Sequence, residues 1–84
     1  MSSPAIKVIF AVYASNRTGK IVTHKCQEIV NTGNDDIPVN NTTFGDSDPG
    51  HKKYFTIQYE TYDSKGKPIG HAKGCQEGTT LDLV

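Results

Sequence analysis

The chain has 84 residues, with nine Lys or Arg and nine Asp or Glu, so its formal net charge is zero. Balanced charge without a basic stripe argues against binding to nucleic acid, and no apolar run approaches the ~20 residues that insert into a membrane. At this length we expect one domain, residues 1–84, whose thin core makes its stability depend on additional contacts such as a partner subunit.

The first predicted element is a β-strand over residues 6–14, which are mostly β-branched or aromatic. Strict alternation places Phe10 and Val12 on the face that packs into the core. The second face is half apolar and consists of Lys7, Ile9, Ala11 and Tyr13. Because such a face is costly to leave in water, we expect a homodimer that covers it.

A turn then leads to a short helix over residues 21–31. Thr23 is the predicted N-cap, because its hydroxyl can accept a hydrogen bond from a free amide of the first turn. Cys26, Ile29 and Val30 are spaced i, i+3 and i+4, which predicts one apolar helix face. The alternative for this segment is another strand.

The second half of the chain is predicted to form strands and turns. Phe55, Ile57 and Tyr59 alternate along the longest strand and are predicted to face the core. The expected strands cover residues 36–39, 51–63, 68–75 and 79–84, with a hairpin turn at 64–67. The fold class is therefore α+β: an antiparallel β-sheet or small sandwich of about five strands, with one short helix after the first strand.

The segment 37–50 is the densest run of Asn, Asp, Gly and Pro in the chain, which predicts a rigid loop. Neighbouring carboxylate and amide groups suit sugar hydroxyls, and a nearby ring can supply an apolar wall. The predicted carbohydrate-binding residues are Asn40, Asn41, Asp46, Asp48 and Tyr54. One alternative is that these residues only build the turn. Another is a calcium site, which needs six to eight oxygen ligands that this spacing does not supply.

Cys26 and Cys75 are too few and too far apart in sequence for a zinc site. They can remain two thiols or form one disulfide, which would close a loop of roughly 50 residues. The histidines His24, His51 and His71 show no metal-ligand spacing. No catalytic motif stands out, so we expect a non-enzymatic protein without a metal or other cofactor.

Several short motifs, each occurring once, are spread over most of the chain. They are Val12-Tyr13-Ala14, Val22-Thr23, Asn40-Asn41, Asp48-Pro49-Gly50 and Glu77-Gly78. This arrangement resembles a small β-rich domain family that includes the C-terminal domain of a mitochondrial DnaJ-type protein and free-standing fungal and microbial proteins. The resemblance implies the fold, but the family has no firmly assigned function, so it implies no catalytic residues.

Together these features predict a small lectin that binds a glycan or glycoprotein through the 37–50 loop. The alternative is a protein-interaction or assembly module, and a further alternative is an inhibitor or defence effector. The first residues lack a basic segment followed by a long apolar one. We therefore expect a cytoplasmic location, or release without a conventional signal peptide.

Overall fold

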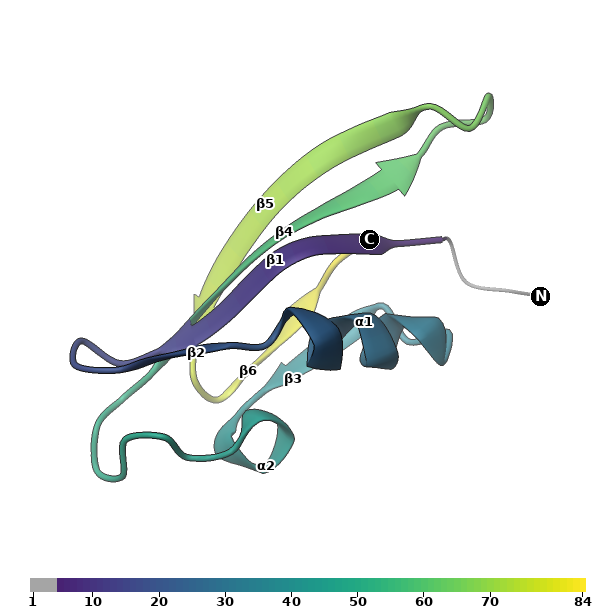
Figure 1. The fold of residues 1–84 in the computed structure, drawn as a ribbon. Coiled ribbons are helices and arrows are strands. Elements are labelled where there is room, and N and C mark those ends of the chain that lie inside the picture. Colours follow the sequence, from purple (N-terminus) through teal and green to yellow (C-terminus); the bar gives the residue numbers. More distant parts are fainter. Residues whose placement is uncertain (1–4) are drawn as a thin grey trace.

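The computed structural model describes residues 5–84 and contains six strands and two helices (Figure 1). In chain order they are β1 (Lys7–Ala14), β2 (Gly19–Ile21), α1 (Thr23–Asn31), β3 (Asp36–Val39), α2 (Asn41–Phe44), β4 (Tyr54–Tyr62), β5 (Pro68–Gln76) and β6 (Thr79–Asp82). The expectation about a signal peptide rests partly on residues 1–4, which lie outside the described residues. Neither helix in the described part is long and apolar enough to cross a membrane.

The strands form two antiparallel sheets in separate layers. The larger sheet has the order β2-β1-β4-β5, and β3 pairs with β6 in the smaller one. Both helices and the β3–β6 pair lie on the same side of the larger sheet (Figure 1). The predicted α+β class is confirmed, and the structure adds the short elements β2 and α2.

A β-bulge in β1 overturns the predicted alternation of its side chains. Val8 pairs with Tyr59 and Phe10 pairs with Gln58, so Ile9 is an extra residue on this strand. A bulge of one residue moves every later side chain of the strand to the other face of the sheet. The core face of β1 therefore changes partway along the strand.

The prediction that Phe10 and Val12 are buried is wrong. Phe10 is 43 % exposed and Val12 is partly exposed, whereas Ala11 and Tyr13 are completely buried. The same shift divides the surface from which a dimer was predicted, because Ala11 and Tyr13 belong to the core of one chain, whereas Lys7 and Ile9 are exposed. Beyond the bulge, the open side of β1 carries Phe10 and Val12.

β4 follows the predicted alternation, and Phe55, Ile57 and Tyr59 are buried as expected. The ring of Phe44 in α2 packs between two rings of the larger sheet. Its centroid lies 5.1 Å from that of Tyr13 and 5.4 Å from that of Phe55. Burial of each such side chain stabilises the fold by about 2 kcal/mol, so these rings attach α2 firmly to the sheet.

The helix α1 begins at Thr23, but Thr23 is not its N-cap. Val22 occupies the cap position, and its side chain makes no cap hydrogen bond. The Thr23 hydroxyl instead accepts a hydrogen bond from the Ala11 backbone N–H at 3.0 Å. Cys26 and Val30 are buried on the helix face that was predicted to be apolar, which confirms that face.

Side chains of α1 occupy the part of the β1 edge that β2 leaves open. β2 pairs only with the last three residues of β1. The Gln27 side chain accepts a hydrogen bond from the Val8 N–H at 2.7 Å and donates one to the Ile6 carbonyl at 3.0 Å. Together with Thr23, it satisfies backbone groups that an edge strand would otherwise present to solvent.

The hairpin between β4 and β5 has the predicted turn. The Asp63 N–H donates to the Lys67 carbonyl at 3.0 Å, and Gly66 has a φ of +81°, which glycine adopts readily. After β5 the chain turns at Gly78 and leaves the larger sheet. β6 then pairs with β3, with Leu81 opposite Ile37. β5 is therefore one edge of the larger sheet.

Candidate functional site

Asn40 is used to begin α2, the short helix inside the loop that was predicted to bind sugar. Its side-chain oxygen accepts hydrogen bonds from the Thr43 N–H at 2.8 Å and from the Thr43 hydroxyl at 3.0 Å. Asn is a preferred N-cap residue because its short side chain reaches the free amides of the first turn. Asn40 could therefore have indicated this helix in the sequence.

Asn41 connects the loop to the core and to the C-terminal turn. Its side-chain oxygen accepts a hydrogen bond from the Tyr13 hydroxyl at 2.7 Å, and its amide donates to Glu77 at 3.2 Å. Burial, and then the negative charges of Glu77 and Asp46, raise the pKa of Tyr13 to about 12. Tyr13 therefore stays protonated and remains a hydrogen-bond donor at neutral pH.

Asp48 is a buried carboxylate, with only 3 % of the residue exposed. It pairs with the Arg17 guanidinium, accepts a hydrogen bond from the Ser15 hydroxyl at 2.6 Å and lies 3.3 Å from His51 Nδ1. The hydrogen bonds from Arg17 and Ser15 hold the pKa of Asp48 well below its ordinary value. Asp48 is therefore charged and occupied by partners within the chain.

Asp46 pairs with Lys53, a lysine of which only 1 % is exposed. The Lys53 Nζ lies 2.5 Å from the Asp46 carboxylate and donates to the carbonyls of Asp48 at 3.2 Å and His51 at 3.1 Å. Sequence reasoning missed Lys53, although it falls in the same alternation as Phe55 and faces the same side of the sheet. This lysine holds together the loop between α2 and β4.

Tyr54 does not join the loop residues. Along β4 the side chains alternate, so Tyr54 is 51 % exposed on one face while its neighbours Lys53 and Phe55 are buried on the other. The loop packs against the buried face, through Phe44. The structure therefore brings Asn41, Asp46 and Asp48 into one bonded loop and places the predicted apolar wall on the opposite side of the sheet.

A surface pocket of about 370 Å³ lies beside Asn41. Its lining residues are Asn41, Gly50, His51, Lys52, Lys53, Glu77 and Gly78. Of the predicted sugar-binding residues, only Asn41 lines it. The pocket offers amide, carboxylate and ammonium groups, and neither Lys53 nor Glu77, which supply two of them, was among the predicted binding residues.

The two cysteines are free thiols and do not form the disulfide that the sequence allowed. Cys26 is buried against the core, whereas Cys75 lies partly exposed on β5. Burial raises the pKa of the Cys26 thiol to about 12 and also raises that of Cys75. Because a nucleophilic cysteine needs a lowered pKa, neither thiol is prepared for covalent catalysis.

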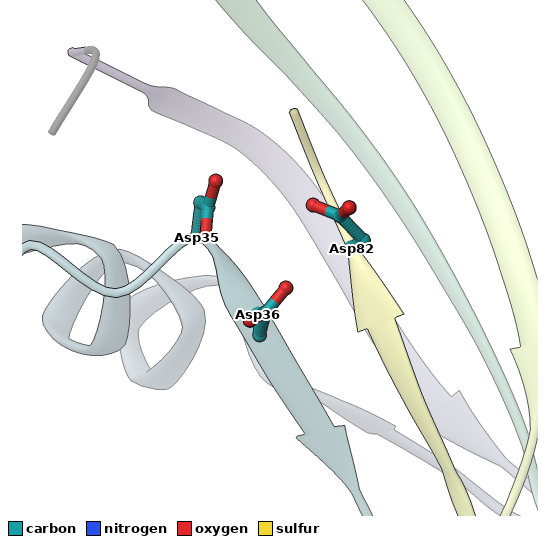
Figure 2. A group of neighbouring side chains, drawn as sticks. All are labelled: Asp35, Asp36 and Asp82. Carbon is teal, nitrogen blue, oxygen red and sulfur yellow. The ribbon is translucent and has the colours of Figure 1, made fainter.

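Three aspartates lie together where β3 and β6 pair (Figure 2). Asp36 stands opposite Asp82 in the register of the two strands, and Asp35 immediately precedes β3. One carboxylate oxygen from each lies within 4.8 Å of the others. Desolvation, and then the charges of Asp35 and Asp82, raise the pKa of Asp36. This group could hold a cation only with further oxygen ligands, since calcium takes six to eight.

We call the side of the larger sheet that faces away from the helices and the β3–β6 pair the open face. No helix or second sheet from residues 5–84 covers it, because those elements pack on the other side. Its large apolar residues are Ile9, Phe10, Val12, Ile21, Tyr54 and Tyr62. Ile21 is 69 % exposed, the largest value among them. The bulge in β1 places Phe10 and Val12 on this face, which the predicted alternation of that strand did not.

Beside these residues, β5 contributes Gly70, Ala72 and Gly74 to the open face. A hollow of about 400 Å³ lies there, lined by Ile9, Gln58, Tyr59, Glu60, Gly70, His71 and Ala72. The surface therefore combines protruding apolar side chains with a depression.

Comparisons of the chain with protein-family models, with curated proteins and with solved structures found no match, so the resemblance to the DnaJ-type domain stays a prediction.

Proposed function

We propose that this chain is a non-enzymatic protein-interaction or assembly module that binds through the open face. One observation carries the proposal. Of the seven large hydrophobic residues that are well exposed among residues 5–84, five lie on this one surface. Single exposed apolar residues are ordinary, but a contiguous group of them is typical of an interaction site.

The charge distribution supports the same function. The exposed side of an antiparallel sheet usually carries polar side chains. Here the paired positions of the larger sheet place only two charged residues on the open face, Lys7 and Glu60, and these stand opposite each other. Such a surface suits an apolar protein partner better than nucleic acid or another strongly charged ligand.

Site-specific photo-crosslinking tests this function directly. A benzophenone amino acid at position 10 would lie on the open face, and one at position 65 would lie in the exposed β4–β5 turn. In extract from the source cells, we expect adducts from position 10 that are absent from position 65. They should also be lost when Ile21→Lys is added. Equal labelling from both positions, or none from position 10, would refute the proposal.

Carbohydrate binding is the second candidate, favoured by the pocket beside Asn41. Its carboxylate, amide and ammonium groups can bond sugar hydroxyls, although the pocket lacks the Tyr54 ring. We expect Lys52→Ala, at an exposed residue of the pocket lining, to weaken a glycan-array signal. Tyr54→Ala, on the other side of the sheet, should leave it unchanged. A wild-type protein with no glycan signal would remove this candidate.

The expected location is the cytoplasm, or outside the cell after release without a conventional signal peptide. The two free thiols, Cys26 and Cys75, support the first of these. Unpaired cysteines are typical of proteins kept in a reducing compartment. Lectin and interaction functions both remain compatible with that location.

A further inference from the structure

The open face has a ridge and a furrow on opposite sides of β4. The ridge consists of Phe10 and Val12 on β1, and the furrow consists of Gly70, Ala72 and Gly74 on β5. In the register of the sheet, Phe10 and Ala72 both pair with Gln58, from opposite sides. The hollow of about 400 Å³ includes Gly70 and Ala72 of the furrow.

We infer that the open face binds the open face of a second copy of this chain, with the ridge of each copy in the furrow of the other. The inference rests on the proposed function and names its partner. A two-fold axis parallel to β4 exchanges the positions of β1 and β5, because each lies one strand away from β4. Phe10 of one copy then lies over Ala72 of the other.

This geometry is what favours a second copy over an unrelated protein. A two-fold interface uses the same surface on both partners, so the surface must be complementary to itself. The ridge and the furrow satisfy that condition with a single rotation. Stacked sheets normally pack their side chains into each other in this way, with strand directions within about 30°.

The net charge of the open face does not oppose the contact between two copies. Lys7 and Glu60 carry opposite charges and stand opposite each other on the open face. The face is therefore neutral, since +1 − 1 = 0, and two copies do not repel each other through net charge. The same rotation places β4 over β4, so the Glu60 residues of the two copies face each other, and each lies one strand away from Lys7 of both copies.

The area indicates a reversible dimer. The three strands that overlap in this arrangement, β1, β4 and β5, are eight or nine residues long. With ~4.8 Å between strands and ~3.3 Å per residue, they give a footprint of about 400 Å² per copy. Specific interfaces begin at about 600 Å² of accessible surface per partner, and protruding side chains raise the accessible area above the footprint. We therefore expect association in the micromolar range rather than a permanent dimer.

Sedimentation equilibrium of the purified chain measures the association. We expect a concentration-dependent dimer, weakened at least tenfold by Ala72→Arg, which fills the furrow, and by Phe10→Ser, which lowers the ridge. Ala72 is exposed, so the arginine has room in the single chain. Ser64→Arg adds the same side chain in the exposed turn and should leave the dimer unchanged.

The arrangement of the two copies in the dimer can be determined by nuclear magnetic resonance. In a mixture of isotope-labelled and unlabelled chains, filtered spectra report only contacts between copies. We expect a cross-peak between the Phe10 ring and the Ala72 methyl group. Within one chain these residues lie two strands apart, about 10 Å. A dimer formed instead by pairing of β5 edges would lack this cross-peak, and that result would overturn the inference.

The two proposals can fail separately. A purified chain that stays monomeric up to ~1 mM, while position 10 still crosslinks to a different protein in extract, refutes the second copy and leaves the interaction function standing. Adducts of twice the chain mass support both. A monomeric chain without specific adducts from position 10 refutes both.

Discussion

Replacing Lys53 with methionine tests whether this buried lysine holds the loop in place. Methionine keeps most of the volume but removes the donor for the carbonyls of Asp48 and His51. Each carbonyl left without a donor costs about 1 kcal/mol. The lost ion pair to Asp46 costs up to about 1 kcal/mol more, since the Asp46 side chain is 36 % exposed. We expect a loss of about 3 kcal/mol.

That loss is a large part of the roughly 8 kcal/mol expected for a chain of this length. It should lower the melting temperature by about 15 °C, which urea and thermal unfolding followed by circular dichroism would measure. The neighbouring residue supplies a matched control, because Lys52 is exposed and Lys52→Met should cost less than ~0.5 kcal/mol. If the two variants unfold alike, Lys53 does not stabilise the loop and the reasoning is refuted.

Ile57→Ala should lower the free energy of unfolding, measured in urea, by ~2–4 kcal/mol. Phe10→Ser, at a concentration where the chain is monomeric, should lower it by less than ~1 kcal/mol. Equal losses would mean that Phe10 is buried like Ile57, which would contradict the bulge. Because Arg17 lowers the pKa of Asp48, the stability from this carboxylate is present above its unfolded pKa near ~3.9 and is lost as pH falls. Arg17→Met should therefore move acid unfolding to higher pH, and an unchanged midpoint would count against the pair. Burial raises the pKa of Cys26 to about 12, so iodoacetamide should modify it ~100-fold more slowly in folded than in unfolded protein; similar rates would place the thiol at the surface.

Alternation predicted β4 well because nothing interrupts its period of two. In β1 the same rule worked only as far as Val8. Ile9 is apolar and β-branched, like the residues around it, so its sequence does not distinguish a bulge from a regular strand position. One inserted residue then reverses every later assignment, which is why Phe10 and Tyr13 were placed on the wrong faces.

The loop shows a different limit. Its Asn, Asp, Gly and Pro residues correctly indicated turns, and Asn40 could have indicated the start of α2. The partners of its side chains were beyond local reasoning, because Asp48 bonds Arg17 across 31 residues and Asn41 bonds Glu77 across 36. Only the packed fold decides whether such polar groups are free for a ligand or already used within the chain.

The bonds from α1 to the edge of β1 have a consequence for aggregation. Gln27 and Thr23 occupy backbone groups there that a neighbouring strand would otherwise use. When α1 detaches, a stretch of β1 that includes the apolar residues Val8 and Ala11 becomes able to pair with a strand from another molecule. We therefore expect local opening of this nine-residue helix, rather than unfolding of the whole domain, to be enough to expose this edge of β1.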